Sequence, residues 1–449
     1  MVLVQIRDYG ERISLEKMSE QKGKVSALLP VGIFLVIFIG MGIVSGDFSR
    51  TPAIVGFLIA LMAAFFQNRK VPFNEKMRIA AAGVGDDNIM TMCLIFLAAG
   101  GFSGAVSAAG GVESTVNFSL SVLPSSVAVV GLMLISCFIS LSMGTSMGTI
   151  AALAPIAVGI SDKTGYPMAL CGAAVVCGAM FGDNLSMISD TTIAAVKTQG
   201  CEMKDKFKAN FLIVLPAALL SLLIFAVISR NGSYEITEPL EYDIIKIVPY
   251  ILVLVGALIG INVFLVLIGG TVISIIIGVA TGAIPWLDIF QAIASGPDGS
   301  SGVTGMYDIT VISIVVACIV AIVKYNGGIA WILQFIRRRI KSQKGAQIGI
   351  AGLTLLVDMA TANNTVAIVI AGPIAKEISN QYGITPKRSA SLLDIFASVG
   401  QGLIPYGAQL LLAAEITGVT PFKMMPYLYY PILMAVSAVC FIVFGKKNV

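Results

Sequence analysis

The chain contains no histidine, few charged residues and no cysteines at the spacing of a disulfide or metal motif. Each of these shortages excludes some classes of function. Histidine is the usual titratable side chain near neutral pH, so any proton coupling here must use a carboxylate, lysine, tyrosine or cysteine. The seven cysteines are odd in number and lack Cys-x-x-Cys spacing, so neither a disulfide framework nor a metal site is indicated. With no Cys–His pair and no soluble catalytic domain, a membrane-embedded enzyme has no support, and no cofactor is expected.

Charged residues make up only 12% of the 449 positions and hydrophobic residues 57%, whereas soluble domains carry about 25% charged residues. Segments 122–161 and 247–287 contain no charged residue at all. Apolar runs of about 20 residues are typical of membrane spans. The sequence therefore predicts an all-α polytopic protein surrounded by membrane lipid. The net charge of +4 does not indicate nucleic-acid binding, because the basic residues are sorted by membrane side.

Fourteen apolar segments follow one another along the chain. They are 27–45, 52–67, 88–109, 124–142, 148–161, 168–181, 209–229, 247–263, 264–284, 309–325, 346–357, 361–379, 389–416 and 425–445. Five are too short or too polar to span unaided, namely 148–161, 168–181, 346–357, 361–379 and 389–416. We expect these five to form half-helices, re-entrant hairpins or broken helices, because irregular backbone at membrane depth needs protein or a cavity around it.

A set of residues recurs at a constant interval of 218 positions. Pro155, Ile156, Ser161, Gly165 and Gly182 recur as Pro373, Ile374, Ser379, Gly383 and Gly400. A small polar cluster precedes each Pro-Ile pair, at 144–146 and 363–365, and an acid in an apolar stretch follows, Asp183 or Asp394. Two equivalent halves, each with an interrupted apolar segment, are typical of secondary transporters that bind their substrate near mid-membrane.

The basic residues predict that the halves insert in opposite directions. With a cytoplasmic N-terminus, 24 of the 29 Lys and Arg residues fall on the cytoplasmic side, as the positive-inside rule requires. Loop 68–87 is basic, whereas its counterpart near 286–308 has no Lys or Arg. Loop 110–122 has none, whereas its counterpart 328–345 carries Arg337–Arg339. Equivalent loops of opposite charge character predict two inverted-topology repeats.

The expected organisation has four parts in a bacterial inner membrane. They are a cytoplasmic N-terminal segment, 1–26; a first transmembrane repeat, 27–229; an acidic external linker, 230–246; and a second, inverted repeat, 247–449. No apolar stretch with a cleavage site begins the chain, so no cleaved signal is expected. The sequence leaves open whether 124–161 forms two spans or a re-entrant hairpin, and whether the chain forms a homo-oligomer.

The first motif is GTSMGT at 144–149, in which Thr145 and Ser146 stand between glycines. Glycine permits a break in a helix, and hydroxyls with freed carbonyls are the hard oxygen donors that a small cation requires. The alternative is close helix packing through Gly144 and Gly148. The equivalent cluster at 363–365 favours ion binding.

The second motif is FGDNLSMISDTT at 181–192. Asp183 and Asp190 are seven residues apart, a spacing that would put both on one helix face, while Ser189, Thr191 and the glycine favour an unwound turn between two half-helices. A carboxylate at the bilayer centre costs at least about 2.5 kcal/mol, so it indicates function. For Asp190, the alternative is that Ser-Asp-Thr-Thr simply caps the following half-helix.

The second half contains three acids in apolar stretches, Asp358, Asp394 and Glu415. Asp394 lies seven residues before Gln401, which is the counterpart of Asp183 at the 218-residue interval. Asp358 directly precedes the second polar cluster. Glu415 is close to a span end, where it can face water.

Together these motifs resemble a known transporter family. GTSMGT at 144–149, Gly-Asp at 182–183 and SDTT at 189–192 resemble the signature of NhaC-type sodium/proton antiporters, within the wider ion-transporter superfamily. The later tracts AIV at 367–369 and LIP at 403–405 are similar to the C-terminal half of that family. The resemblance covers most of residues 88–445 and implies the inverted-repeat fold with cation-coupled exchange.

Several positions depart from the family pattern. Asn184 stands where the family usually has lysine, Met187 where it has proline, and Ile193 where it has asparagine. In the second half, Leu393 replaces a glutamate and Tyr406-Gly407 replaces Trp-Asn. The family also includes exchangers of organic acids, so these departures concern the substrate more than the class.

The leading hypothesis is a sodium/proton antiporter in which Asp183, with Asp394, binds Na⁺ when deprotonated and releases it on protonation. Burial favours the neutral acid and a bound cation favours the carboxylate, so Na⁺ and H⁺ compete. The other expected site residues are Thr145, Ser146, Ser189, Asp190, Thr191, Asn363, Asn364 and Thr365. Among them, Ser146 and Asn364 are the expected Na⁺ ligands beside Asp183.

The alternative is a Na⁺- or H⁺-coupled transporter of a small organic solute, such as an amino acid or a carboxylate. The half-helix N-termini after Gly148 and Ser189 could hold a carboxylate through backbone N–H groups. A channel is less favoured, because paired broken helices suit alternating access. The cation selectivity and the stoichiometry are not determined by the sequence.

Overall fold

The computed structural model describes residues 23–45, 53–122, 127–187, 189–230, 240–259, 261–297 and 302–444, and the regular elements among them are all helices. The α-helices are α2 (Leu29–Ser45), α3 (Ala53–Phe66), α4 (Phe73–Val84), α5 (Asp87–Ala108), α6 (Gly111–Val122), α7 (Ala128–Met143), α8 (Ser146–Thr164), α9 (Met168–Leu185), α10 (Asp190–Gln199), α11 (Met203–Arg230), α12 (Ile244–Leu258), α13 (Val263–Ala280), α14 (Ile289–Ala294), α15 (Tyr307–Tyr325), α16 (Gly328–Arg337), α17 (Gln343–Thr361), α18 (Asn364–Tyr382), α19 (Pro386–Leu403), α20 (Ala408–Thr417), α21 (Pro421–Met424) and α22 (Tyr429–Phe444). The prediction of an all-helical protein is confirmed.

Six of the described helical segments are long and apolar enough to cross a membrane, and the bent pair Pro421–Tyr427 and Tyr429–Phe444 makes a seventh. Two of the six are 32-residue segments, Met168–Gln199 and Pro386–Thr417, and each includes an internal break. The first comprises α9 and α10, and the second comprises α19 and α20. The structure is therefore that of a polytopic membrane protein.

The expectation that five apolar segments are too short or too polar to span unaided is wrong for two of them. Segments 168–181 and 389–416 lie within the spans Met168–Gln199 and Pro386–Thr417, whereas 148–161, 346–357 and 361–379 are not among the described helices long and apolar enough to cross a membrane. The helices α8, α9, α17, α18 and α19 contain 18 or 19 residues each, or about 27 Å at 1.5 Å per residue. Their apolar runs look shorter because buried polar residues such as Asn184, Arg388 and Ser391 interrupt them. These side chains are buried against other parts of the protein, so a hydropathy profile underestimates the length of each helix.

The helix boundaries repeat at the interval that the sequence shows. Each of α8, α9 and α10 has a partner, α18, α19 and α20, which begins and ends 218 positions later. Pro155 in α8 corresponds to Pro373 in α18, and both helices end at a left-handed glycine, Gly165 or Gly383. The repeat thus extends from single residues to whole helices.

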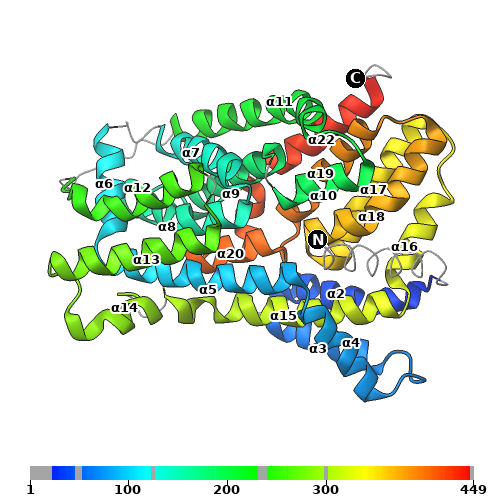
Figure 1. Ribbon diagram of the computed structural model, residues 1–449, viewed down its shortest axis with the longest axis horizontal. Coiled ribbons are helices and arrows are strands. Elements are labelled where there is room, and N and C mark those ends of the chain that lie inside the picture. The colour runs from blue at the N-terminus through cyan, green and yellow to red at the C-terminus, as the bar shows by residue number, and fades with distance from the viewer. Residues whose placement is uncertain are drawn as a thin grey trace, which may run out of the picture.

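The half-helix after each break packs into the other half of the molecule. Helix α10 lies against α18 and α19, and helix α20 lies against α8 and α9. Figure 1 shows α10 beside the orange helices α18 and α19, and α20 beneath the green-cyan pair α8 and α9. This exchange is reciprocal, so each half completes the surroundings of the other half's break.

The short connections before α8 and α18 reverse the chain through left-handed residues. Gly144 has φ 68° and ends α7, and its counterpart Ala362 has φ 51° and ends α17. Glycine adopts this conformation freely, whereas for alanine it is strained and typical of functional sites.

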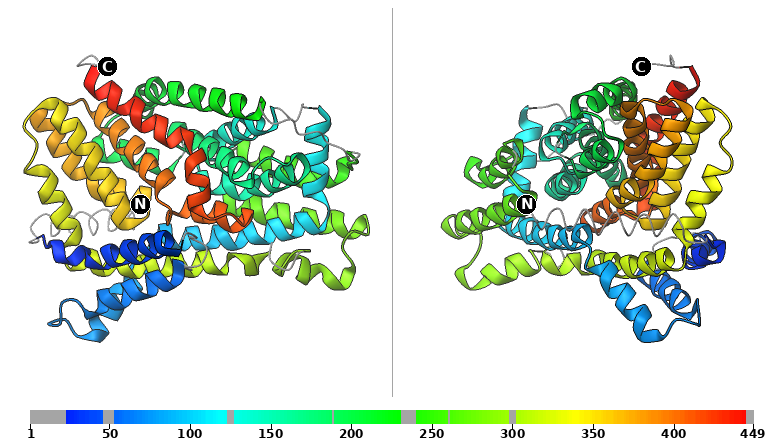
Figure 2. Two further views of the ribbon diagram at one scale, coloured as in Figure 1. Left: turned by 180° about the vertical axis from the view of Figure 1, so that it is seen from behind. Right: turned by 45° about the vertical axis from the view of Figure 1, so that its right-hand side comes forward.

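A further group of helices packs around α5 and α15. Helix α5 lies between α13 and α15, while α3 and α4 pack on α15. In Figure 2, α4 projects away from the rest of the molecule. Helices α4, α6 and α16 occupy segments expected to be loops, so that expectation is corrected. Most of segment 1–26 and of linker 230–246 lies outside the described residues.

Candidate functional site

Asp183 lies in the last turn of α9 and is only 4% exposed. Its Oδ2 accepts a hydrogen bond of 2.9 Å from Ser146 Oγ, and its Oδ1 accepts one of 2.6 Å from Ser189 Oγ. Ser146 is the first residue of α8, and Ser189 lies in the break before α10. Among the described residues, no lysine or arginine forms an ion pair with Asp183.

Further polar groups surround the two hydroxyls. Thr191 Oγ1 lies 2.9 Å from Ser189 Oγ. When Asp183 is ionised and accepts from the Ser189 hydroxyl, Thr191 is the donor to Ser189. Gln409 Nε2, from α20 in the second half, donates to Ser146 Oγ over 3.1 Å. Both halves of the chain therefore contribute to the surroundings of Asp183.

Asp394 on α19 lies in a neighbouring centre, and its carboxylate is paired with Lys206 of α11. The side chains of Lys206 and Asp394 are 1% and 0% exposed. Lys206 Nζ also donates to the Asn184 carbonyl and to Thr192 Oγ1, each over 2.7 Å. All three ammonium N–H donors are therefore used, which a fully buried cation requires.

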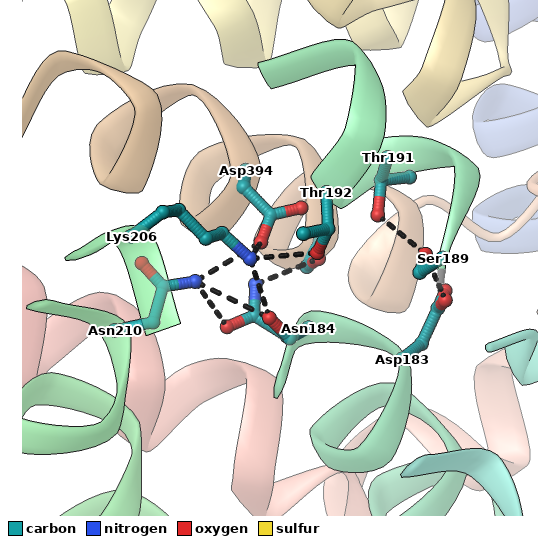
Figure 3. A network of polar contacts seen from close by, with 9 residues as sticks. Asp183, Asn184, Ser189, Thr191, Thr192, Lys206, Asn210 and Asp394 are labelled. Carbon is teal, nitrogen blue, oxygen red and sulfur yellow. Dashed lines mark hydrogen bonds and ion pairs between the residues drawn. The ribbon is translucent and has the colours of Figure 1, made fainter. Parts of the chain in front are cut away.

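Asparagine side chains connect this pair to the break after α9 (Figure 3). Asn210 Nδ2 donates to Asp394 Oδ2 and to Asn184 Oδ1, each over 3.0 Å. Asn184 Nδ2 in turn donates to Ser398 Oγ over 3.2 Å. Since Asn184 directly follows Asp183, the two acids belong to one polar region at the end of α9.

Thr145 and Asn363 play the same structural role at equivalent positions. Thr145 Oγ1 accepts from the Gly148 N–H and caps α8, and Asn363 Oδ1 accepts from the Val366 N–H and caps α18. The capping of both helices follows from the preference for Thr and Asn at this position.

The polar cluster of the second half stays apart from Asp183 in hydrogen bonding. Asn364 Oδ1 accepts from the Thr365 N–H over 3.0 Å. Within the described part of the chain, no hydrogen bond links Asn363, Asn364 or Thr365 to Asp183 or Asp394. Joint coordination of one ion by both clusters stays a prediction.

Asp190 does not share the environment of Asp183. The break places it at the start of α10, where it is exposed while Asp183 is buried. The expectation of one common helix face is therefore wrong, because α9 ends at Leu185 and a separate helix, α10, begins at Asp190. A negative charge in the first turn of α10 interacts favourably with the helix dipole, and Ser189 is free to bind Asp183.

Lys206, Asn210 and Gln409 were not anticipated as site residues. Lys206 lies between Lys204 and Lys208, so the sequence assigns it to a basic cytoplasmic segment. The signal that could have identified it is its spacing of four from Asn210, which puts both side chains on one helix face. No feature of the sequence indicates the role of Gln409, since that role depends on the packing of α20 against α8.

Comparison with known proteins identifies the family. The model described as "Na+/H+ antiporter family" matches residues 19–228 and 235–446. This chain belongs to the Na⁺/H⁺ antiporter family. It is a membrane transporter, and the family as named consists of antiporters, with Na⁺ and H⁺ as transported ions.

Individual relatives are distant but similar in length. The chain is 23% identical to the Na⁺/H⁺ antiporter NhaC of Alkalihalophilus pseudofirmus, over 94% of this chain and 96% of that protein. It is 21% identical to the malate-2H⁺/Na⁺-lactate antiporter of Bacillus subtilis, over 93% and 94%. Among solved structures, the YdaH transporter of Alcanivorax borkumensis matches with TM-score 0.41 and 13% identity, covering 94% of this chain and 99% of that one.

Proposed function

We propose that this antiporter exchanges Na⁺ for H⁺ by letting the two ions compete for the carboxyl group of Asp183. The observation that carries the proposal is the pair of hydroxyl donors, Ser146 and Ser189, which hold both oxygens of a buried acid with no ion-pair partner described. A carboxylate in such a place needs either a proton or a cation, because burial of an unpaired charge is costly.

The surroundings of Asp183 suit both ionic states. When a proton is bound, the carboxyl is neutral and the Ser146 and Ser189 hydroxyls satisfy its oxygens. When Na⁺ is bound, each hydroxyl group can rotate so that its hydrogen points away from the ion and its oxygen becomes a ligand, since a hydroxyl is both donor and acceptor. Thr145, Thr191 and Asn364 are proposed as further oxygen donors of the site, with Asn363, Thr365 and Asp190 at its edge.

Asp394 is proposed to have a different part in the cycle. Its charge is already balanced by Lys206, so it does not need a transported cation in this conformation. The pair instead fixes α11 and α19 at the end of α9, where Asn184 accepts from Lys206. Asp183 is then the acid that is free to exchange its cation.

Transport is proposed to occur by alternating access between two inverted repeats in a bacterial inner membrane. The proposed repeats are 27–229 and 247–449, with the N-terminus in the cytoplasm. The matched helix boundaries and the reciprocal packing of α10 and α20 support a two-fold relation. The pairs α7–α8 and α17–α18 would be the re-entrant hairpins. No resident cofactor is required, and the surrounding lipid contacts the outer helices.

Purified protein in liposomes with an internal pH dye tests the exchange directly. After external Na⁺ is added, the direction of the pH change in the lumen distinguishes antiport from symport, because these two mechanisms move protons in opposite directions. Antiport predicts proton efflux and an alkaline lumen. An acid shift, or a response that appears only with an added organic acid or amino acid, would support the coupled solute transporter instead. One relative is named as a malate-2H⁺/Na⁺-lactate antiporter.

A further inference from the structure

Helix α16, which follows α15, lies at the level where a membrane span ends. Segment Val303–Tyr325 is long and apolar enough to cross a membrane, and α16 begins shortly after it, at Gly328. Its ten residues cover about 15 Å, roughly half of the hydrocarbon core, so α16 does not span. Residues Ile329, Ile332 and Leu333 bury one side of α16 against the protein, and Figure 1 shows the helix at the edge of the molecule.

The other side of α16 carries a column of stacked rings that ends in a cation. Trp331 and Phe335 are four residues apart and so lie on one helix face, and their rings are stacked with centroids 4.9 Å apart. The guanidinium carbon of Arg339, another four residues along the chain, lies 4.0 Å from the centre of the Phe335 ring. A stacked guanidinium uses its face for the ring and keeps the N–H groups at its edge for an anion.

These two rings line a cavity of about 540 Å³ together with Gly23, Arg338 and Arg339. Gly23 approaches α16 so closely that a Cβ atom there would lie 2.5 Å from the Trp331 Cα, so a larger residue would displace the helix. Arg338 and Arg339 are exposed, and no carboxylate in the described part of the chain forms an ion pair with either. Two cations in one cavity without an acidic partner favour an anionic ligand.

We propose that this cavity binds the phosphate headgroup of an anionic phospholipid. Arginine can donate to two phosphate oxygens at once in a planar geometry, and basic pockets beside membrane spans suit anionic headgroups. The indole of Trp331 suits the membrane–water interface, where it can contact the glycerol and the upper acyl chains. A soluble anion would use the arginines alone, whereas a lipid uses the arginines and the rings. This lipid site is additional to the ion exchange proposed for Asp183 and does not depend on it.

Tryptophan fluorescence can measure this binding, because the chain contains only two tryptophans, Trp286 and Trp331. In Trp286→Phe, which changes a side chain that is 75% exposed, Trp331 is the single reporter. The purified full-length variant is placed in vesicles of phosphatidylcholine and phosphatidylglycerol, one of which carries bromine on its acyl chains as a quencher. We expect a preference for phosphatidylglycerol over phosphatidylcholine of about fivefold for each arginine in the cavity.

Variants in this single-tryptophan background separate the cavity from general surface charge. Arg338→Gln/Arg339→Gln should abolish the preference. Phe335→Leu keeps both charges and should lower the preference, because it removes the ring on which the guanidinium is stacked. Arg69→Gln/Arg78→Gln is the matched control, because it removes two exposed arginines of another segment, and it should keep the preference. Sodium phosphate and sodium chloride of equal ionic strength should reduce the preference equally, since both only screen the charges.

Four outcomes would overturn the proposal. Equal quenching by the two brominated lipids would exclude a preference for an anionic headgroup. Equal losses in the two double-arginine variants would indicate surface charge rather than a built site. Loss of the preference in phosphate but not in chloride would assign the cavity to a free anion. Absence of quenching by either lipid would show that protein, and not lipid, covers Trp331.

Discussion

The two acids near the end of α9 differ in their hydrogen-bond and ion-pair partners. Asp394 accepts from an ammonium and an amide, whereas Asp183 accepts from two hydroxyls alone. Hydroxyls leave the net charge of the carboxyl unchanged. This difference supports the proposal that Asp183 is the acid that alternates between a proton and a metal cation.

Replacement of Asp183 by asparagine should remove exchange without loss of the fold. The amide is close in shape to the carboxyl and still accepts from a hydroxyl, but it carries neither a transported proton nor a charge for Na⁺. We expect Na⁺-driven proton flux in liposomes to fall to the level of vesicles without protein. Asp162→Asn is the matched control and should retain wild-type flux. Near-normal coupled flux in Asp183→Asn would remove this residue from the mechanism.

Loss of a neutral ligand should weaken Na⁺ binding less than loss of the Asp183 carboxylate does. Ser146→Ala removes one hydroxyl from Asp183, and we expect the half-saturating Na⁺ concentration to rise about tenfold, as for loss of roughly 1–1.5 kcal/mol. Asn364→Ala should also raise it, and the two effects should be non-additive if both residues bind one ion. Unchanged Na⁺ dependence in Asn364→Ala alone would show that the second cluster serves a different ion or only packing.

At the scale of elements, one ion pair joins three helices. Lys206 on α11 contacts Asp394 on α19 and the Asn184 carbonyl on α9. Removal of one partner of a buried pair leaves an uncompensated charge, whereas replacement of both by apolar groups is often tolerated. The pair should therefore matter most when only one member is changed.

Lys206→Met should lower the stability of the purified protein by roughly 3–5 kcal/mol, because Asp394 is left buried and unpaired. The double variant Lys206→Met/Asp394→Leu should recover much of this loss. Lys204→Met changes an exposed lysine that pairs with Glu202, and its effect should stay within about 0.5 kcal/mol. Denaturant unfolding of the detergent-solubilised protein measures all three. Equal losses in the single and double variants would show that the charge pair is not the cause.

The elements differ in how well the sequence predicts them. Long apolar helices such as α11 and α15 follow from hydropathy, and the break after α9 follows from the glycine and hydroxyl residues around Asp183. Amphipathic helices such as α4 do not follow from hydropathy, because their charged faces resemble cytoplasmic loops. Lys206 and Gln409 were missed for a different reason. Their partners lie far away in the sequence, so their roles exist only after α11 and α20 have packed.

At the scale of the whole molecule, the repeat makes a prediction about topology. Loops 68–87 and 285–308 are counterparts and should lie on opposite sides of the membrane. Ser300, which the sequence offers as an external position, lies outside the described residues. Leu287, which is 89% exposed, is a described alternative in the same loop, and Lys70 is an exposed residue in the other.

Cysteine labelling checks this topology in a background without native cysteines. Leu287→Cys should react with an impermeant thiol reagent in intact cells, and Lys70→Cys should react only after permeabilisation. The reverse pattern would invert the orientation of the protein. Labelling of both from the outside would contradict the inverted repeat itself, because counterpart loops would then share one side.

The central claim is that Na⁺ and H⁺ compete for one carboxyl group, and the pH dependence of apparent Na⁺ affinity tests it most directly. On the acidic side, protons occupy Asp183, so the half-saturating Na⁺ concentration should rise about tenfold for each unit of decrease in pH, while the maximal rate is kept. On the alkaline side the carboxylate is already free, and the half-saturating concentration should become constant. A half-saturating Na⁺ concentration that does not change with pH, while only the maximal rate changes, would show that the two ions bind at separate sites.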